Sequence, residues 1–315
     1  MKPKQSQRLP RRPFGTPRND IRLWALVMAG GHGKRLWPLS TPKKPKPFLK
    51  LIPGKKTLLE ETLLRLKSVI PAKQIFLIGN QDRLALLRQF GSPVPKEQII
   101  GEPVLKNTAA TVVLAASRIA KKDPEALLLV LPADHWIGNV SRFQSAVKKA
   151  AHASRVRGQF SVFGIKATSP SSSYGYLKAG RKVSDSIYHL DQFVEKPPAE
   201  RAERFLKTGK YFWHAGIFLA PVSEILNSAK RFQPVLYRLI NKMDVRNGKI
   251  FPSRLFSKLP QISFDYAVLE RLKNADMVYS DCDWSDVGSW ESLADLWAKS
   301  GRVNSSFIHQ LTSGK

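Results

Sequence analysis

The chain has 315 residues, 43% of them hydrophobic, a single cysteine and a formal net charge of +28 at pH 7. This length suits one large α/β domain or two small ones, and the lone Cys282 excludes an internal disulfide framework and favours a reducing, cytoplasmic compartment. No run approaches the roughly 18 apolar residues of a membrane span, and the start lacks the apolar segment of a secretory signal, so no membrane insertion is expected.

The first segment, residues 1–20, contains six Lys and Arg residues and one acidic residue, Asp20. Its proline and arginine content predicts a basic disordered tail. The other excess positive charges are spread along the remaining chain. They come with no RNP aromatics, zinc-ligand spacing or basic zipper, so no nucleic-acid partner is expected. Weak attraction of the basic surface to anionic membranes stays open.

Apolar runs and helix-period segments alternate from residue 21 to residue 300, which we interpret as one domain. Strands are predicted at 23–29, 74–78, 126–131, 160–165, 188–194, 216–220 and 275–279. Helices are predicted at 57–69, 81–89, 108–121, 141–154, 222–230, 234–242, 265–271 and 289–299. Residues 301–315 are predicted to fray. This alternation predicts an α/β fold, a mostly parallel sheet with helices on both faces, whose ligands bind at the carboxyl ends of the strands.

A glycine cluster follows the first predicted strand, at Gly30, Gly31 and Gly33. Glycines permit positive φ and close approach of the backbone to a ligand, and successive N–H groups in such a loop bind anions. Lys34 and Arg35 add positive charge for phosphate oxygens. The segment is neither a Walker A loop nor a dinucleotide fingerprint, and a plain tight turn stays the alternative.

The loop continues into a proline-rich segment, residues 42–51, that excludes helix. Between Gly31 and Lys56 the chain has eight Lys and Arg residues, Lys46 among them, and no acidic residue. Uncompensated positive charge beside a glycine-rich turn suits a triphosphate. A solvated basic loop is the alternative interpretation.

Two aspartates occupy turns at predicted element ends. Asp134 follows the strand predicted at 126–131, and Asp286 lies in a glycine-containing turn before the last helix. Two carboxylates suit Mg²⁺, a hard cation that binds through one or two carboxylates plus phosphate. Alternatively, each aspartate caps its own turn.

In their order, these motifs resemble the sugar-1-phosphate nucleotidyltransferases, a GT-A-like α/β family, over residues 23 to 297. The variant Leu36-Trp37-Pro38-Leu39 resembles the mannose-1-phosphate guanylyltransferases within it. Further matching stretches are 45–49, 101–103, 107–109, 131–135, 174–176, 193–197, 213–218, 263–267 and 284–290.

The resemblance implies transfer of a guanylyl group from GTP to mannose 1-phosphate with Mg²⁺, giving GDP-mannose and pyrophosphate. It implies catalytic roles for Arg35, Lys46, Asp134 and Lys196, and a metal site at Asp134 and Asp286. It implies nucleotide binding by Gly30, Gly31, Gly33, Lys34, Glu102, Asn107 and Thr108. It implies sugar-phosphate binding by Gly175, Glu195, Lys196 and His214.

His214 departs from the family's usual Asn, which leaves the sugar open: a heptose or another hexose 1-phosphate is the alternative substrate. Strictness for guanine also stays open, as does a homodimer. A catalytically silent, nucleotide-binding regulatory homologue is the other alternative, and the intact Arg35, Lys46, Asp134 and Asp286 argue against it. We expect His135 to be structural and Cys282 to be an ordinary buried or half-buried thiol.

Overall fold

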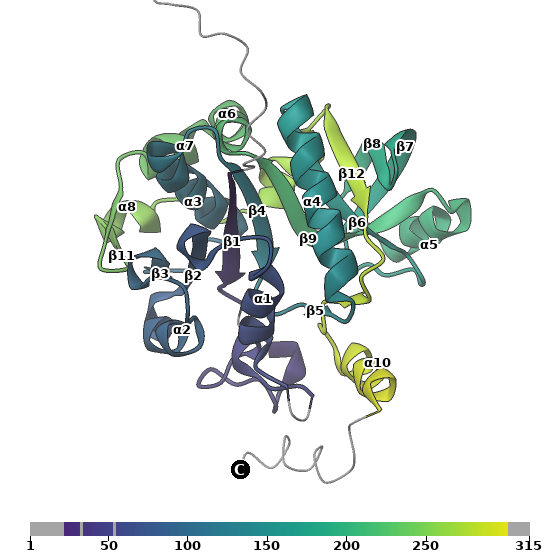
Figure 1. Ribbon diagram of the computed structural model, residues 1–315, viewed down its shortest axis with the longest axis horizontal. Helices are drawn as coiled ribbons and strands as arrows, with labels where there is room; N and C mark the ends of the chain where they lie inside the picture. The colour runs from purple at the N-terminus through teal and green to yellow at the C-terminus, as the bar shows by residue number, and fades with distance from the viewer. Residues whose placement is uncertain (1–21, 32–33, 53–54, 302–315) are drawn as a thin grey trace, which may run out of the picture.

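The computed structural model of the chain describes residues 22–31, 34–52 and 55–301. Within these, an 11-stranded sheet carries helices on both faces, and a two-stranded ribbon lies apart from it (Figure 1). The predicted tail at 1–20 and, apart from Gly301, the predicted tail at 301–315 lie outside the described residues, as does Gly33. None of the described helices combines the length and the hydropathy that crossing a membrane requires.

The first half of the chain supplies the centre of the sheet. Its strands are β1 (Leu23–Ala29), β2 (Ile75–Asn80), β3 (Ile99–Glu102) and β4 (Leu127–Pro132). Its helices are α1 (Leu58–Leu66), α2 (Leu84–Phe90), α3 (Thr108–Lys122) and α4 (Val140–Arg157). Short 3-10 turns connect them at η1 (Lys34–Leu36), η2 (Lys46–Phe48), η3 (Ala72–Gln74), η4 (Gln81–Arg83) and η5 (Lys96–Gln98).

The remaining elements extend the sheet to its two ends. The strands are β5 (Trp136–Ile137), β6 (Phe160–Lys166), β7 (Tyr176–Ser184), β8 (Ile187–Val194), β9 (Tyr211–Pro221), β10 (Asp244–Arg246), β11 (Lys249–Phe251), β12 (Ala275–Tyr279) and β13 (Trp284–Ser285). The helices are α5 (Ala199–Thr208), α6 (Val222–Phe232), α7 (Pro234–Ile240), α8 (Ser253–Ser257), α9 (Phe264–Ala267), η6 (Leu269–Arg271) and α10 (Trp290–Ser300). In Figure 1, α8 and β11 lie at one end of the sheet, and β7, β8 and α5 lie at the other.

The strand order is β10-β11-β3-β2-β1-β4-β9-β6-β12-β8-β7, which confirms the predicted α/β architecture. Strands β3, β2, β1 and β4 run parallel, so their carboxyl ends meet at one edge. Strand β9 is antiparallel to both β4 and β6, and β8 is antiparallel to β12. The parallel arrangement therefore holds in the first half, and the whole sheet is mixed.

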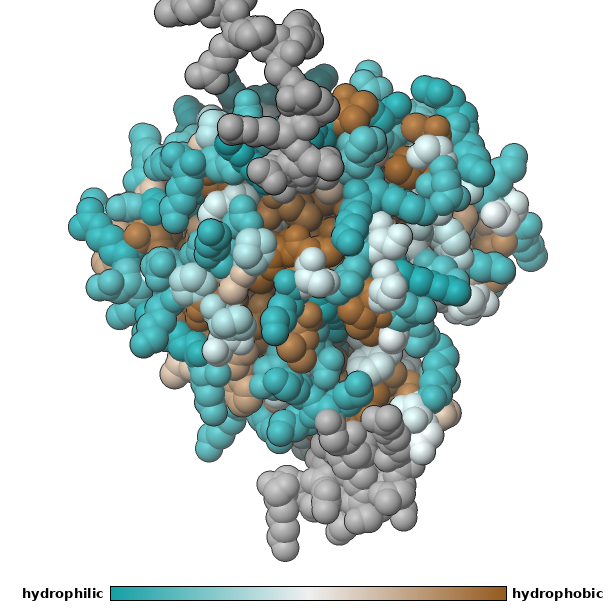
Figure 2. All heavy atoms as spheres, viewed as in Figure 1, coloured by the Kyte–Doolittle hydropathy of each residue, from teal (hydrophilic) through white to brown (hydrophobic). Residues whose placement is uncertain are grey.

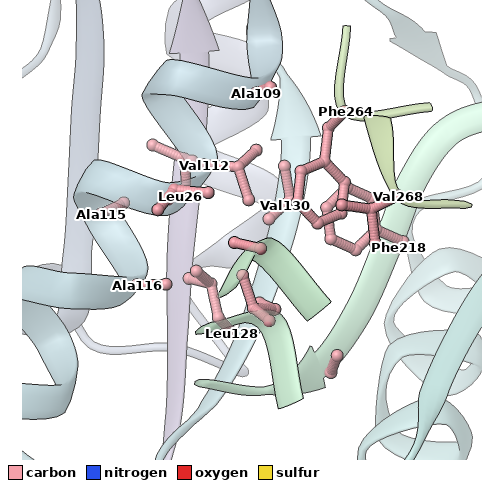
Figure 3. Packing of buried hydrophobic residues seen from close by; sticks show 14 of the residues in the cluster. Leu26, Ala109, Val112, Ala115, Ala116, Leu128, Val130, Phe218, Phe264 and Val268 are labelled. Carbon is pink, nitrogen blue, oxygen red and sulfur yellow. The ribbon is translucent and has the colours of Figure 1, made fainter. Parts of the chain in front are cut away.

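Alternate residues of β1 pack on opposite faces of the sheet, as its pleat requires. Trp24 and Leu26 belong to one core, with α3, α6 and α7; Ala25 and Val27 belong to the other, with α1 and α4. Figure 3 shows Ala109, Val112, Ala115 and Ala116 of α3 against Leu26, Leu128 and Val130 of the sheet. Seen from outside (Figure 2), one face is mostly hydrophilic, with hydrophobic residues gathered near its centre.

Three predicted elements differ from the structure. The helix predicted at 81–89 divides into η4 and α2 at Arg83, whose φ of −110° is not helical. The strand predicted at 216–220 is the second half of β9, an 11-residue strand that begins at Tyr211. Its first half mixes aromatic residues with a histidine and so has no continuous apolar run, although Trp213, His214 and Ala215 are buried there too. The helix predicted at 265–271 is interrupted at Val268, whose φ of −134° is not helical, and divides into α9 and η6.

Candidate functional site

Two adjoining cavities open at the carboxyl ends of the parallel strands. The first, about 340 Å³, lies beside β3, and we call it the β3 cavity; the second, about 460 Å³, lies over β9, and we call it the β9 cavity. Both are lined by Met28, Thr108 and Pro132. Of the residues expected from the sequence, the β3 cavity is lined by Gly30, Gly31, Glu102, Asn107, Thr108 and Asp134. The β9 cavity is lined by Arg35, Thr108, Gly175, Glu195, Lys196, His214 and Asp286.

Glu102, the last residue of β3, is a buried carboxylate, 3% exposed, on the wall of the β3 cavity. The Thr111 hydroxyl of α3 donates a hydrogen bond to Glu102 Oε1. Burial raises the pKa of Glu102 to about 7, and the bond from Thr111 offsets only part of that shift. The position therefore offers a hydrogen-bond acceptor whose charge changes near neutral pH.

The start of α3 lies between the two cavities. Asn107 is its N-cap, and Asn107 Oδ1 accepts the Thr108 N–H at 2.8 Å. The Thr108 hydroxyl accepts the Phe264 N–H at 2.8 Å, which ties α3 to α9. Both side chains thus hold the helix start in place, where the positive end of the helix dipole faces the cavities.

The glycine loop differs from the sequence expectation. The sequence suggested that these glycines adopt positive φ. Neither Gly30 nor Gly31 does, so that interpretation is wrong at these two positions. A Cβ at Gly31 would meet no atom within 4 Å, so the missing side chain instead leaves the cavity wall open. Arg83 Nη1 donates to the Gly31 carbonyl at 3.2 Å and fixes the loop. Gly33 and the side chain of Lys34 lie outside the described part of the chain.

Lys46 lies buried between the two predicted metal ligands. Its Nζ is 3.1 Å from Asp134 Oδ2 and donates to the backbone carbonyl of Asp286. Burial raises the pKa of Asp134, but the charges of Lys46 and His135 and the bond from Lys46 lower it below its ordinary value overall. Asp134 is therefore ionised at neutral pH.

Asp286 lies at the edge of the β9 cavity. Its Oδ1 accepts the Tyr174 hydroxyl at 2.9 Å and the Gly288 N–H at 3.1 Å, and its Oδ2 is 3.9 Å from an Arg35 guanidinium nitrogen. A Cβ at Gly288 would lie 2.2 Å from Asp286 Oδ2, so this turn needs glycine. The Arg35 side chain is 67% exposed and free to meet a ligand.

The two aspartates are linked by the ribbon of β5 and β13. Strand β5 begins two residues after Asp134, β13 ends directly before Asp286, and Trp284 pairs with Ile137. The Lys46 ammonium already lies among oxygen atoms of both aspartates. One carboxylate oxygen, of Asp134, and one backbone carbonyl, of Asp286, thus surround a positive charge, and oxygen ligands of this kind fit a hard divalent cation such as Mg²⁺.

Four charged or titratable side chains gather on the floor of the β9 cavity. Lys196 Nζ is 3.2 Å from Glu195 Oε1, and His214 Nδ1 is 3.3 Å from Asp265 Oδ1. Ligand atoms of Glu195, His214 and Asp265 all lie within 4.8 Å of one another, so these three also have the geometry of a metal site. Gly175 belongs to the same wall, because a Cβ there would lie 2.6 Å from Glu195 Oε2.

Burial governs the protonation of this cluster. It raises the pKa of Asp265 to about 6 and lowers the pKa of His214 to about 4. Burial also raises the pKa of Glu195, and the nearby charge of Asp265 raises it further. The imidazole is thus neutral at pH 7. Asp265 was missed as a site residue because α9 is too short and irregular for the sequence to reveal which side faces the cavity.

His135 lines the β9 cavity and also makes contacts of the structural kind expected of it. Its Nδ1 accepts the Trp284 indole N–H at 3.1 Å, and its carbonyl accepts two hydrogen bonds from Arg65 of α1, each 3.1 Å long. Burial lowers the pKa of His135 to about 4, so the ring is a neutral acceptor. These contacts join α1 and the β5–β13 ribbon around Asp134.

The family of nucleotidyl transferases matches this chain over residues 24–301. A mannose-1-phosphate guanylyltransferase of Escherichia coli is 37% identical over 295 residues, covering 90% of this chain and 61% of that protein. One from Klebsiella pneumoniae is 36% identical, with the same coverage of 90% and 61%. The chain thus spans about three fifths of the length of these relatives.

Solved structures share the fold. A mannose-1-phosphate geranyltransferase from Thermus thermophilus superimposes with a TM-score of 0.79 at 32% identity, covering 88% of this chain and 80% of that one. A UDP-glucose pyrophosphorylase gives a TM-score of 0.56 at 15% identity, covering 89% of this chain and 100% of that one, a likeness of fold alone.

Proposed function

Because the chain belongs to the nucleotidyl transferase family, we propose that it transfers a guanylyl group from GTP to mannose 1-phosphate, giving GDP-mannose and pyrophosphate. One observation carries this proposal above all: two cavities of different chemistry adjoin at Met28, Thr108 and Pro132, with Asp134 on the wall of the β3 cavity and Arg35 and Asp286 on the wall of the β9 cavity. The relatives named for this activity support it.

The β3 cavity suits a guanine base. Guanine presents two neighbouring donors, N1–H and the N2 amino group, and one carboxylate accepts both. Adenine has an unprotonated N1 at the same position, which an ionised Glu102 would repel. Gly30 and Gly31 lie on the same wall, so the triphosphate would run from the base toward Arg35 and the start of α3.

The β9 cavity suits a sugar phosphate. Glu195 and Asp265 accept hydrogen bonds from sugar hydroxyls, and neutral His214 offers one further polar contact. Lys196, 56% exposed at its side chain, supplies the positive charge for the phosphate. Gly175 leaves room for the ring beside Glu195.

The reaction forms a bond between a sugar-phosphate oxygen and the α-phosphorus of GTP, and it breaks the bond from that phosphorus to the pyrophosphate. The attacking phosphate is ionised at neutral pH, so no protein base is needed. Catalysis is positioning and charge neutralisation. Arg35 neutralises the triphosphate, Lys196 holds the attacking phosphate, and Lys46 keeps Asp134 and the Asp286 backbone in place.

We also propose that Asp134 and Asp286 hold Mg²⁺, rather than the cluster at Glu195, His214 and Asp265, whose carboxylates face the sugar. When bound, a divalent cation neutralises charge on the phosphate oxygens. We propose the cytoplasm as the compartment, because the chain has one cysteine and no disulfide framework. We keep as proposals the division of the chain into residues 1–20, 21–300 and 301–315, and a homodimer.

Pyrophosphate release, measured for four nucleoside triphosphates against several sugar 1-phosphates with Mg²⁺, tests the function. We expect the highest kcat/KM for GTP with mannose 1-phosphate. A higher kcat/KM with a heptose 1-phosphate or another hexose 1-phosphate would change the proposed sugar substrate but not the proposed reaction. Nucleotide binding without release from any pair would support a regulatory homologue instead.

A further inference from the structure

Glu270 lies behind the turn that carries the sugar-phosphate residues. It is on η6, which follows α9 in the chain and packs against β8. Strand β8 ends at Val194, so the next amide, of Glu195, is past the end of that strand. That amide donates to Glu270 Oε1 at 2.6 Å. A partly buried N–H needs an acceptor, and here a side chain from a distant segment provides it.

The same turn contains an unusual backbone conformation. Lys196 has a φ of 46°, in the left-handed region that residues with a side chain rarely adopt. Such a conformation persists only where the surroundings hold it, and it often marks a functional site. Here the turn brings Lys196 Nζ within 3.2 Å of Glu195 Oε1 while both side chains line the β9 cavity.

We propose that Glu270 is a positioning residue, whose carboxylate holds the Glu195 amide and thereby the left-handed turn that presents Glu195 and Lys196 to the sugar phosphate. This rests on the proposed function. A hydrogen bond from an N–H to a carboxylate is stronger than one to a neutral oxygen, which suits a contact that maintains a strained turn. Glu270 is not among the residues that line the β9 cavity, so it acts on the sugar phosphate through Glu195 and Lys196.

Substitution of Glu270 tests the proposal. Glu270→Ala should raise KM for mannose 1-phosphate about tenfold and leave KM for GTP within about twofold, since the β3 cavity is untouched. Glu270→Gln keeps an accepting oxygen and should raise the first KM only about threefold. The control is Glu203→Ala on α5, an exposed glutamate, which should change neither. Equal changes in both KM values, or none, would overturn the proposal.

A double-mutant cycle with Lys196→Ala separates positioning from general stability. If Glu270 acts through the turn, Glu270→Ala should add less than about twofold to the KM of the Lys196→Ala enzyme. Independent, multiplicative effects would overturn the proposal. Where Glu270→Ala does not fold, as judged by its melting temperature, the cycle is run with Glu270→Gln.

Calorimetry with mannose 1-phosphate alone separates this inference from the reaction. Glu270→Ala should weaken binding about tenfold, the same ratio as for KM. If the wild type binds mannose 1-phosphate in a Glu270-dependent way but releases no pyrophosphate, the proposed function fails and the positioning role holds. If turnover and binding are both unaffected by Glu270→Ala, the positioning role fails and the function holds.

Discussion

Two carboxylates on the wall of the β3 cavity show how a single neighbour decides the charge of a side chain. Asp134 is paired with the Lys46 ammonium at 3.1 Å, and its pKa falls below the ordinary value. Glu102 has the Thr111 hydroxyl and no ion pair with any of the residues that the structure describes, and burial raises its pKa to about 7. The first is an anion at neutral pH, and the second changes charge near neutral pH.

The raised pKa of Glu102 predicts pH-dependent nucleotide binding. Guanine donates to the ionised carboxylate, so GTP should bind about tenfold more tightly at pH 8 than at pH 6, and binding below pH 7 should release a proton. Calorimetry in buffers of different ionisation enthalpy measures both. In Glu102→Gln the extra pH dependence should vanish, while any contribution of the GTP phosphates remains. Identical pH profiles in the two proteins would contradict base recognition by Glu102.

Without nucleotide the same group affects folding. The pKa of Glu102 is higher in the folded state, about 7, than in the unfolded chain, where a glutamate titrates near about 4.3. Its contribution to stability is therefore complete below about pH 4 and is lost as the pH rises through 7. Because Glu102→Gln cannot ionise, its free energy of unfolding should decrease less than that of the wild type between pH 5 and pH 8 in urea titrations.

Asp134→Asn removes one charge from the proposed metal site. We expect turnover to fall by about 100-fold or more, a typical effect of losing a group that stabilises charge in the transition state. Mn²⁺ binding, followed by electron paramagnetic resonance, should weaken in parallel. Asp281→Asn, at a carboxylate 62% exposed and paired with Arg142, is the control. Unchanged Mn²⁺ affinity in Asp134→Asn would place the metal elsewhere.

His214 and Ala215 face opposite sides of β9. His214 lines the β9 cavity, whereas Ala215 is 1% exposed in the core shared with α1 and α4. His214→Asn alone should therefore change the kcat/KM ratio between mannose 1-phosphate and another hexose 1-phosphate, by about tenfold, or about 1.4 kcal/mol. Ala215→Ser should leave that ratio unchanged and lower the melting temperature. A shift caused by Ala215→Ser would contradict this orientation.

At the scale of elements, α1 and the β5–β13 ribbon form the support of Asp134. Arg65 donates from α1 to the carbonyls of His135 and Glu61, and it is only 3% exposed. Burial lowers the pKa of Arg65 to about 10, so the guanidinium is charged at neutral pH. A buried cation of this kind is stable only with its acceptors in place.

Arg65→Met keeps the length and apolar stem of the side chain and removes every donor. The carbonyl of His135 then loses two hydrogen bonds in a buried position, at a cost of about 1–3 kcal/mol for an unsatisfied group. Urea unfolding should show this loss, and turnover should fall as Asp134 loses its fixed position. Arg88→Met, at an exposed position of α2, is the comparison; the Arg88 guanidinium also donates to a carbonyl, that of Asn247, and its loss should cost less. Equal costs would show that burial of Arg65 does not matter.

At the scale of the molecule, long apolar runs can be recognised in the sequence, whereas the pairing of strands that are far apart in the chain cannot. Strands β1, β2, β4 and β6 were found because their buried residues are contiguous. The direction of β9 and the ribbon of β5 and β13 depend on contacts between segments more than 80 residues apart. For the same reason the sequence motifs predicted many residues of the cavity walls. The positions of Asp265 and Glu270 beside those residues could be recognised only in the folded structure.

The proposed substrates are two polyanions, so the net charge of +28 predicts a strong effect of salt. A net positive charge attracts anionic substrates over about 10 Å at 0.1 M salt, the Debye length, and farther in more dilute buffer. We expect kcat/KM for both substrates to fall about tenfold or more between low and high ionic strength at fixed free Mg²⁺. Little change across that range would mean that remote charges do not attract the substrates.

Lys121 and Lys122 separate this long-range attraction from contact. They are exposed at the end of 15-residue α3, about 20 Å along the helix from Thr108 at about 1.5 Å per residue. Replacing both by Gln should lower kcat/KM in dilute buffer and have no effect at high salt, where screening removes the attraction. Arg35→Ala, at the cavity itself, should lower kcat/KM at every salt concentration. If the double variant keeps the full salt dependence of the wild type, that salt dependence comes only from charges at the cavities.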